Sequence, residues 1–523
     1  MDPLIASLLR PEAYPHPTGR IELRETHSAW VLLTGPYAYK LRKPVNFGFL
    51  DFSTLERRRF FAAEELRLNR RLAPDLYLDL VNVQGPPERA QLGGEEPGIE
   101  VAVRMRQFDE QQLLSLLASR GPLADTALDG LAGELARFHS QAATAPADGP
   151  YGTPAAVRQP VDDNLKVLDG VPELAEALTV ALTEALAELQ CWLEAEAVRL
   201  EPFFGQRLRD GHIRECHGDL HLGNLWLENG RIRVFDCLEF NPGLRWIDTI
   251  SELAFLVMDL QVRGQEQGGL RLLNGWLDLC GDWQGLRSWR WYSVYRALVR
   301  AKVAELRRRQ GGSSEAAAER DRYVQRALLW CRPRPRALVL THGVSGSGKS
   351  WLSERLAPRL GALRLRSDVE RKRLFGLWGE PRRTSLSGDP YRAEVSELLF
   401  SHTLPSHAEA VLAGGFTALV DATFLRQDDR RPFLELAERL GVPLLILALP
   451  CPAELARARI AERQRLGRDP SDAGLEVLER QLRIIEPLTS SERAAATVVE
   501  VEPDTDPAAL ALQLKAPLQL EPL

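Results

Sequence analysis

The sequence has few cysteines, no long hydrophobic run and little net charge. Its six cysteines are spread widely over 523 residues and form no C-x-x-C pair, which excludes a disulfide framework and a cysteine-based zinc site. The strongest apolar runs, such as Pro443–Leu449, have the length of a strand and fall far short of the ~20 residues that span a bilayer. A net charge of −6 provides no overall field for attracting nucleic acid or an anionic membrane. We therefore expect no membrane partner, and nucleic acid is disfavoured.

The beginning of the sequence also lacks a targeting pattern. Residues 1–17 contain no basic segment followed by an apolar core, so we expect no signal peptide and predict a cytoplasmic protein. Hydrophobic residues at 45% and charged residues at 26% are ordinary globular values. At roughly 100–200 residues per domain, the length predicts about three to five globular units.

The clearest break in the chain is a Gly- and Ser-rich segment that is followed by alternating prolines. The helical, basic stretch Tyr295–Arg309 runs into Gln310–Ser314, a second helical pattern covers Glu315–Trp330, and Arg332–Arg336 contains the prolines. This composition is typical of a semi-rigid spacer. The predicted division is an N-terminal domain at 1–309, a linker at 310–335, a C-terminal domain at 336–503 and a tail at 504–523.

The two halves have different patterns of strands and helices. Short β-like runs at Ile21–Thr26, Ala29–Thr34 and Tyr37–Arg42 predict a meander, and Phe52–Leu72 has helical spacing. From Leu113 onward helices dominate the first half. The second half alternates apolar strands with helices, which predicts a parallel sheet with crossover helices.

The strongest motif is a phosphate-binding loop at Gly343–Ser350, which matches G-x-x-x-x-G-K-[ST] in full. It follows the apolar strand Ala337–Thr341 and opens a predicted helix. Glycines let backbone amides surround a β-phosphate, and the helix N-terminus adds positive potential. Lys349 would reach the β- and γ-phosphates, and Ser350 would also bind Mg²⁺. The predicted phosphate-binding residues are Gly343, Ser345, Gly346, Ser347, Gly348, Lys349 and Ser350.

Three further features accompany this loop. Asp421 closes a second apolar strand and is predicted to bind Mg²⁺, with an N-cap as the alternative. Asp368 falls at the end of the presumed second strand, where a carboxylate could accept the proton of an acceptor hydroxyl. Arg459 and Arg463 lie in an arginine-rich helix that could close over the nucleotide and neutralise transition-state charge. A solvated helix face is the alternative for the arginines.

On these residues the C-terminal block resembles the small P-loop kinases of the gluconate kinase, polynucleotide kinase and zeta-toxin type. The resemblance covers about 336–503 and depends on Gly343–Ser350, Ser367-Asp368 with Arg371, Val420–Thr423, and Arg459 with Arg463. It implies an α/β P-loop NTPase fold and ATP-dependent phosphorylation of a hydroxyl. A motor-type ATPase is disfavoured because the segment is short and has no evident sensor module.

The first half contains a second catalytic pattern. His217–Asn224 fits H-G-D-x-x-x-x-N, and the apolar strand Arg231–Asp236 ends in a carboxylate 17 residues after Asp219. Protein-kinase-like folds use these parts as a catalytic-loop Asp and two Mg²⁺ ligands. A single hairpin would bring them around one cleft, with Asp219 as the base and Asn224 and Asp236 as the metal ligands.

A lysine and a glutamate upstream complete this pattern. Lys40 ends a predicted strand and Glu65 lies on the next helix, which matches the ion pair that positions the α- and β-phosphates in kinases. Lys43 is a competing candidate, but Lys40 is in phase with the strand. No glycine-rich loop precedes Lys40, so phosphate binding would depend on Ser28 and backbone amides.

The pattern is closest to the aminoglycoside phosphotransferase family, over about Pro11 to Arg309. Val103–Phe108 would be the hinge strand, Leu135–His139 resembles the helix before the catalytic loop, and Asp236–Ala254 resembles the metal-to-helix segment. The resemblance implies an α+β protein-kinase-like domain with an N-lobe at about 11–107 and a C-lobe at about 108–309.

Two local alternatives concern metal and acceptor binding. His217 and His221 could suggest zinc, but a third ligand is not evident, and His217 is expected to support the catalytic loop. A pocket for a polycationic aminoglycoside should be lined with carboxylates, whereas the stretch Trp283–Arg309 is rich in arginine and favours an anionic or neutral acceptor. The arginines and lysine concerned are Arg290, Arg296, Arg300, Lys302, Arg307, Arg308 and Arg309.

The leading hypothesis is therefore an enzyme with two kinase domains, each transferring the γ-phosphoryl group of ATP to a hydroxyl of a small-molecule acceptor with Mg²⁺. One alternative is a regulatory protein in which one ATP-binding domain controls the other. A second is a nucleic-acid or nucleotide end kinase, which would need a local basic groove.

Overall fold

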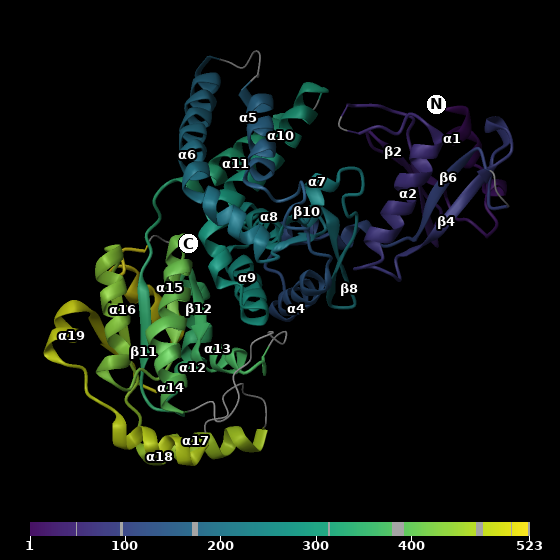
Figure 1. The fold of residues 1–523 in the computed structure, drawn as a ribbon. Coiled ribbons are helices and arrows are strands. Elements are labelled where there is room, and N and C mark those ends of the chain that lie inside the picture. Colours follow the sequence, from purple (N-terminus) through teal and green to yellow (C-terminus); the bar gives the residue numbers. More distant parts are fainter. Residues whose placement is uncertain are drawn as a thin grey trace. The chain divides into compact units, whose positions relative to one another are not determined.

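The chain forms two compact units in a computed structural model (Figure 1). Unit 1 contains residues 1–131, 141–157 and 202–259, and unit 2 contains residues 132–140, 158–201 and 260–523. The structure describes residues 1–48, 50–94, 98–169, 176–311, 314–378, 392–466, 474–503 and 505–520.

Unit 1 begins with a six-stranded antiparallel sheet in the order β1-β2-β3-β6-β4-β5. The predicted meander is confirmed, because β1 pairs with β2 and β2 pairs with β3. Leu32, Tyr39 and Leu41 on β2 and β3 pack into a buried apolar cluster, as alternating side chains on a sheet face should. The strands are β1 Glu22–Glu25, β2 Ala29–Leu33, β3 Tyr37–Arg42, β4 Tyr77–Gln84, β5 Gln91–Leu92 and β6 Glu100–Arg106.

Helix α2 (Leu55–Asn69) packs over this sheet beside β4 and β6. It begins at Thr54, whose side chain accepts a hydrogen bond from the Arg57 amide at 3.3 Å and so caps the first turn. Ala62 of α2 shares a buried cluster with Val101 and Val103 of β6. This packing fixes the face of α2 on which Glu65 lies.

A β-hairpin later in unit 1 spans the predicted catalytic segment. Strands β8 (Leu225–Glu228) and β9 (Arg231–Val234) pair antiparallel, and Asn229 and Gly230 between them both have positive φ. Two such residues make the tight turn whose twist suits a two-residue hairpin. The hairpin therefore returns the chain so that the segment before β8 and the segment after β9 lie at the same end. Strands β7 (Ile213–Glu215) and β10 (Trp246–Asp248) form a second small ladder.

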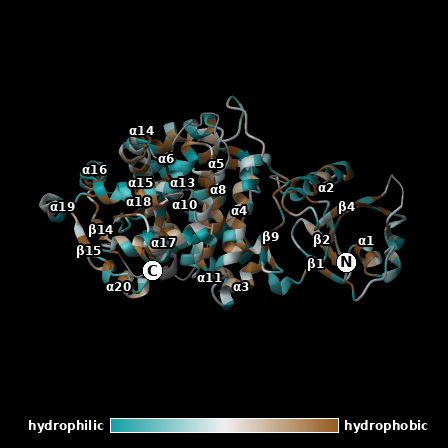
Figure 2. Ribbon diagram, turned by 90° about the horizontal axis from the view of Figure 1, so that it is seen from below, coloured by the Kyte–Doolittle hydropathy of each residue, from teal (hydrophilic) through white to brown (hydrophobic). Residues whose placement is uncertain are grey.

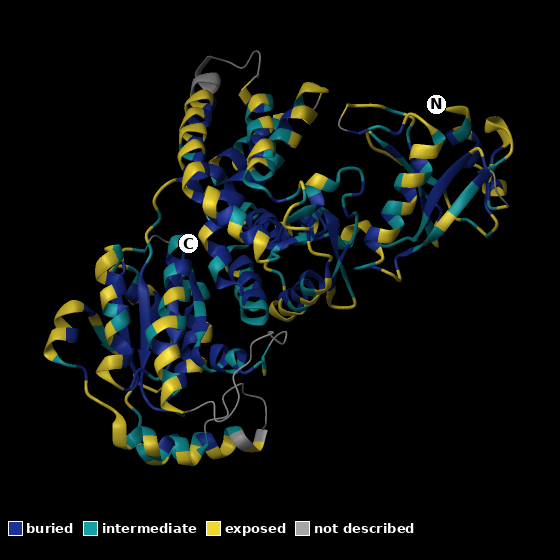
Figure 3. Ribbon diagram, viewed as in Figure 1, coloured by how far each residue is buried: buried dark blue, intermediate teal, exposed yellow. Residues whose placement is uncertain are grey.

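Unit 2 contains a five-stranded sheet in the order β12-β13-β11-β14-β15, and all of its ladders are parallel. The predicted parallel sheet is thus confirmed. The central strands are wholly buried (Figure 3), as expected for a sheet with helices on both faces. The strands are β11 Leu338–His342, β12 Ala362–Arg366, β13 Thr417–Asp421, β14 Leu444–Ala448 and β15 Thr497–Glu500.

Helices of the predicted linker and tail belong to the packed part of unit 2. Helix α11 (Ser314–Cys331) lies within the predicted linker and packs against α10 (Trp289–Arg309), while residues 312–313 fall outside the described residues. Helix α20 (Pro507–Lys515) lies beyond residue 503, and its Leu510 and Leu514 share a buried cluster with the sheet. The core of the P-loop region therefore extends past the predicted end of that domain.

The remaining helices surround these sheets. They are α1 Pro3–Leu8, α3 Leu114–Arg120, α4 Asp125–Gln141, α5 Pro154–Asp169, α6 Glu176–Arg209, α7 Pro242–Arg245, α8 Thr249–Val262, α9 Glu266–Cys280, α12 Lys349–Leu356, α13 Ser367–Leu374, α14 Ala393–Leu398, α15 Leu404–Ala413, α16 Gln427–Leu440, α17 Ala453–Leu466, α18 Leu475–Ile484 and α19 Ser490–Ala495. Many of them carry both hydrophilic and hydrophobic residues (Figure 2). Among the described residues, none of the helices combines the length and the apolar character that crossing a membrane requires.

Candidate active sites

A buried group of opposite charges forms around Lys40 in unit 1. The Lys40 ammonium lies 2.8 Å from the Glu65 carboxylate of α2 and 2.7 Å from the Asp236 carboxylate that follows β9. Burial alone would lower the pKa of Lys40, but the charges of Asp236 and Glu65 outweigh it and the pKa is raised. The structure thus brings together three residues that the sequence separates widely.

Two further charges, Arg42 and Glu239, were missed by the sequence analysis. Arg42 lies two residues after Lys40 on β3, and period-two alternation places both on one face of the strand. The Arg42 guanidinium pairs with Glu65 and lies 2.5 Å from the carboxylate of Glu239. Burial raises the pKa of the Glu239 carboxyl group. The strand phase that selected Lys40 was also the signal that could have identified Arg42.

The predicted catalytic loop brings Asp219 and Asn224 together. The Asn224 side-chain amide donates to the Asp219 carboxylate at 3.0 Å and to the Asp219 backbone carbonyl at 2.9 Å. The backbone amide of Leu222 donates to the Asp259 carboxylate at 2.9 Å, which fixes the middle of the loop. The Asp219 side chain is 36% exposed, so a solute can reach it.

His217 supports this loop from inside the protein. Its Nε2 lies 2.9 Å from the Phe235 carbonyl oxygen, and its Nδ1 accepts from the Asp219 amide at 3.2 Å. Burial lowers the pKa of His217, which favours the neutral ring that this donor and acceptor pattern requires. Both ring nitrogens are thereby used by the backbone, which argues against the zinc alternative at this residue.

Asp236 has a backbone conformation that few residues other than glycine adopt. Its φ is 62°, and its amide donates to the Tyr77 hydroxyl at 3.1 Å. The next amide, that of Cys237, donates to the Asn69 side chain of α2 at 2.8 Å. These two bonds hold the segment after β9 in the turn that aims the Asp236 carboxylate at Lys40.

Ser28 and Lys43 lie apart from the buried charges around Lys40. Ser28 is in the turn between β1 and β2, and its carbonyl accepts from the Lys43 amide at 2.8 Å. The Lys43 ammonium pairs with Glu25 at 2.6 Å. Of the two candidate lysines, Lys40 is therefore the one that meets Glu65 and Asp236.

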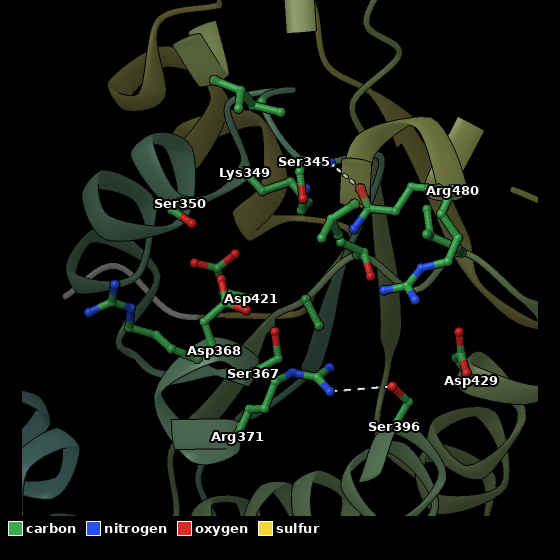
Figure 4. A pocket seen from close by; sticks show the side chains of 18 of the residues that line it. Ser345, Lys349, Ser350, Ser367, Asp368, Arg371, Ser396, Asp421, Asp429 and Arg480 are labelled. Carbon is green, nitrogen blue, oxygen red and sulfur yellow. Dashed lines mark hydrogen bonds between the residues drawn. The ribbon is translucent and has the colours of Figure 1, made fainter. Parts of the chain in front are cut away.

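The phosphate-binding loop of unit 2 lies between β11 and α12, beside a cavity of about 420 Å³. Gly346 has a φ of +83°, and a Cβ there would come within 2.7 Å of the Ala456 carbonyl, so the loop needs glycine at this position. The Lys349 ammonium donates to the Val344 carbonyl at 2.7 Å. Burial lowers the pKa of Lys349 to about 8. Figure 4 shows Lys349, Asp421 and Arg371 among the residues around this pocket.

Asp421 and Asp368 line this cavity, the first from the end of β13 and the second from the start of α13. Asp421 ends β13 opposite Arg366 of β12, and its carboxylate accepts from the Ser353 hydroxyl of α12 at 2.9 Å. The presumed second strand ends at Arg366, so Asp368 lies in the first turn of α13 rather than on the strand. Asp368 is therefore positioned by α13 and not by the sheet.

Residues of the C-terminal helices reach the phosphate-binding loop. Arg459 of α17 donates to the Gly346 carbonyl at 3.3 Å, and Arg463 lines the cavity one turn later. Gln481 of α18, which sequence reasoning missed, accepts from the Ser345 amide at 2.7 Å. Gly343, Ser347 and Gly348 belong to the same loop. Ser350 is the second residue of α12, and it is exposed.

The far side of the cavity is rich in arginine. Arg371 of α13 is buried, and its guanidinium donates to the Ser396 hydroxyl at 3.3 Å. Arg426 pairs with Asp429 at 3.2 Å, and Arg480 also lines the wall. Cationic side chains therefore outnumber carboxylates on this wall.

The basic residues of α10, in contrast, have partners on α10 itself and on α11. Arg300 and Arg307 pair with Glu319 of α11, and Arg308 and Arg309 pair with Glu305 at 2.9 Å. Arg290 donates to the Trp330 carbonyl at 2.8 Å. These contacts pair five of the seven basic residues that the sequence analysis named, so an anionic or neutral acceptor at this stretch stays a prediction.

The residues of both sites fit Mg²⁺ by the chemistry of their donors. Asp236 and Asn224 in unit 1, and Asp421 and Ser350 in unit 2, offer carboxylate, amide and hydroxyl oxygens. Hard oxygen ligands are those that Mg²⁺ takes in phosphoryl-transfer sites.

Comparison with known proteins identifies both regions. Residues 54–292 match the "Phosphotransferase enzyme family", and residues 338–488 match the family described as "AAA domain". The fold is thus an α+β kinase-like domain of the phosphotransferase type followed by a P-loop kinase domain with a parallel sheet.

The chain is also similar to other proteins over most of its length. Uncharacterized proteins of Mycobacterium tuberculosis and Mycobacterium bovis are 33% identical to it over 407 residues, which is 77% of this chain and 78% of each relative.

Solved structures of kinases resemble one half each. A choline/ethanolamine kinase family protein from Mesorhizobium loti is 15% identical, with a TM-score of 0.36 over 60% of this chain and 88% of its own. A gluconokinase from Sinorhizobium meliloti is 23% identical, with a TM-score of 0.22 over 36% of this chain and 94% of its own.

Proposed function

This chain belongs to the family of these mycobacterial proteins, and we propose that it is an ATP-dependent phosphotransferase with two active kinase domains. The observation that carries the proposal is the cavity at the phosphate-binding loop, because its lining includes Lys349, Asp421 and Asp368. A cation for phosphate oxygens, a metal-binding carboxylate and a second carboxylate are the parts that γ-phosphoryl transfer requires.

In the P-loop domain the roles follow from position. Lys349 and the amides of Gly343–Ser350 would bind the phosphates, while Ser350 and Asp421 would hold Mg²⁺. Bound Mg²⁺ neutralises charge on the phosphate oxygens. Asp368 would take the proton from the acceptor hydroxyl as its oxygen bonds to the γ-phosphorus and the bond to the ADP oxygen breaks.

In the kinase-like domain the corresponding residues come from unit 1. Lys40, positioned by Glu65, would bind phosphate oxygens, and Asn224 and Asp236 would hold the metal. Asp219 would accept the proton of the hydroxyl, and its hydrogen bond from Asn224 orients the carboxylate for that task. Ser28 and nearby amides would take the place of a glycine-rich loop.

For the P-loop domain we propose an acceptor that carries its own anionic group. Arg371 is buried and donates a hydrogen bond to Ser396, which fixes its planar guanidinium on the wall of the cavity at the phosphate-binding loop. Arginine binds carboxylate and phosphate through paired hydrogen bonds, and so suits such a ligand. Incubation with γ-labelled ATP and a metabolite extract, followed by mass spectrometry, would identify the product. Labelled products without an anionic group on the acceptor would contradict this assignment.

The two-site proposal is tested by counting nucleotides. Calorimetry with a non-hydrolysable ATP analogue and Mg²⁺ should give two equivalents for the intact chain. Lys349→Ala should give one, because several kcal/mol of charge-assisted contact disappear at the P-loop only. Lys40→Ala should also give one, whereas Lys43→Ala is the matched control, since Lys43 pairs with Glu25, and should keep two.

The outcome also decides between the enzyme and its rival. A single equivalent on the intact chain, lost in Lys349→Ala, would mean that the kinase-like domain does not hold ATP. Two equivalents with turnover at only one of them would favour a regulatory role for the other domain.

A further inference from the structure

Helix α13 has two faces with different neighbours. Asp368 and Arg371, three residues apart, line the cavity at the phosphate-binding loop. Glu370 and Arg373, also three residues apart, are each 2% exposed and are absent from the cavity wall. The second face must therefore be held by another part of unit 2.

That part is the turn after α9. The Trp283 indole N–H donates to the Glu370 carboxylate at 2.9 Å, and the Trp283 side chain is fully buried. The Glu370 carboxylate also accepts from the Arg373 guanidinium at 3.1 Å. A buried carboxylate needs such partners, and both restrict how α13 can rotate about its axis.

The C-terminal end of α9 completes the attachment. The Arg373 guanidinium donates to the backbone carbonyls of Asp278 at 2.6 Å and Leu279 at 3.0 Å, which are in the last turn of α9. A cation suits that end of a helix, where carbonyls lack intrahelical partners. Gly281 has a φ of +71°, and a Cβ there would lie 2.6 Å from the Arg373 Nε. Glycine at this position leaves room for the guanidinium.

Helix α9 also contacts the strand that leads into α13. β12 is the edge strand of the sheet, and the Asn274 carboxamide accepts from the Arg364 amide at 2.6 Å and donates to the Arg364 carbonyl at 3.1 Å. One side chain thus makes both hydrogen bonds that a neighbouring strand residue would make. The strand and the helix after it are held by the same element.

We propose that Trp283 and the last turn of α9 are positioning elements for the acceptor side of the P-loop site, because they hold α13 with Asp368 and Arg371 facing the cavity. The inference rests on the proposed function of that site. Residues that precede residue 310 in the sequence would then help to position the acceptor side of the C-terminal kinase site. Trp283 touches neither nucleotide nor acceptor and acts through Glu370.

The test uses the full chain carrying Asp219→Ala, so that turnover at the first site is removed. In this background Trp283→Phe should speed hydrogen exchange over Ser367–Leu374 by about tenfold, since a hydrogen bond to a buried charge is lost. ATP hydrolysis with water as acceptor should fall about tenfold in kcat, because Asp368 loses its position. Affinity for a non-hydrolysable ATP analogue should stay within about twofold, since Lys349 and the loop are untouched.

Trp276→Phe is the matched control. Trp276 is on α9 itself, is equally buried, and its indole N–H donates to His139 Nδ1 at 3.1 Å, away from α13. It should leave exchange over Ser367–Leu374 unchanged. Glu370→Gln, which keeps an oxygen for the Trp283 N–H, should give a smaller change than Glu370→Ala.

Unchanged exchange of α13 in Trp283→Phe, or an equal change in Trp276→Phe, would overturn the inference. Faster exchange with unchanged kcat would also overturn it, because α13 would then be held without any effect on the site. Absence of ATP hydrolysis in the parent chain and in Lys349→Ala alike would instead count against the proposed function, while the exchange result would still decide whether Trp283 positions α13.

Discussion

The ammonium of Lys40 lies 2.7 Å from the carboxylate of Asp236, although 196 residues separate them in the chain. Mg²⁺ at Asp236 and phosphate at Lys40 would each compete with this ion pair. The pair therefore links the two proposed ligands of the site.

We predict that Asp236→Asn weakens binding of the Mg²⁺–ATP analogue at the first site by at least about tenfold, since the metal loses a charged ligand. Metal-free analogue should bind as well as before or slightly better, because Lys40 is released. Calorimetry with and without Mg²⁺, in the Lys349→Ala background, measures both. Asp79→Asn removes another unit 1 ion pair, with Arg104 at 2.6 Å, and should change neither value.

Asp219→Ala should lower turnover at the first site by roughly 10²–10⁴-fold, the usual contribution of a general base. Affinity for the analogue should remain within about twofold, because the proposed base contacts the acceptor rather than the nucleotide. Steady-state ATP consumption in the Lys349→Ala background reports the change. Asp210→Ala, at an exposed carboxylate of the same unit, serves as control. Wild-type turnover in Asp219→Ala would refute the assignment.

Glu305→Gln should destabilise unit 2 by about 2–4 kcal/mol, because the buried Arg320 loses one of its two ion pairs and keeps only that with Asp321 at 2.7 Å. Glu305 is fully buried and lies 3.0 Å from the buried Arg320 of α11. The urea midpoint followed by tryptophan fluorescence measures the loss. Glu319→Gln, at a carboxylate whose side chain is 17% exposed, should cost less. Equal costs would show that burial does not decide the value of these pairs.

Asp278→Asn should make stability less dependent on pH. Burial raises the pKa of Asp278 to about 6, above its ordinary value of 3.8. The folded protein therefore holds this proton more tightly than the unfolded chain, and wild-type stability falls as pH rises from about 4 to 6. At pH 7.5 the variant should be more stable than wild type by about 1–2 kcal/mol, and the difference should shrink at pH 4.5. Urea titrations at both pH values measure the difference in the free energy of unfolding. An equal difference at both pH values would contradict a raised pKa of Asp278 in the folded protein.

Local motifs were sufficient to predict the parts of both sites that depend on short spacing. The Asp219–Asn224 contact and the Lys349 loop each lie within eight residues, where backbone geometry leaves few arrangements. Lys40 and Glu65 were also identified, because a strand and the following helix pack in a known way in kinase-like domains. The ion pair between Lys40 and Asp236 also required the hairpin turn at Asn229, which the 17-residue spacing allows.

The parts that were missed depend on contacts between distant segments. Glu239 belongs to the buried charges around Lys40 because it pairs with Arg42. No local sequence pattern connects two residues so far apart in the chain. Charge composition could not show that most basic residues of α10 take part in ion pairs, because such pairs and ligand-binding residues look alike in sequence. A Gly-rich segment suggested a spacer, yet α11 packs against α10 through buried side chains such as Tyr323 and Val324.

The carboxamide of Asn274 has a consequence for any chain that is cut between the halves. β12 is an edge strand, and its backbone at Arg364 is hydrogen-bonded by that one side chain. Without α9, the released fragment would present an unprotected strand edge to other copies of itself, and such edges recruit further strands. Proteolysis before residue 336 should thus yield aggregates in place of a free P-loop kinase, so the fusion of the two halves also acts as protection against self-association.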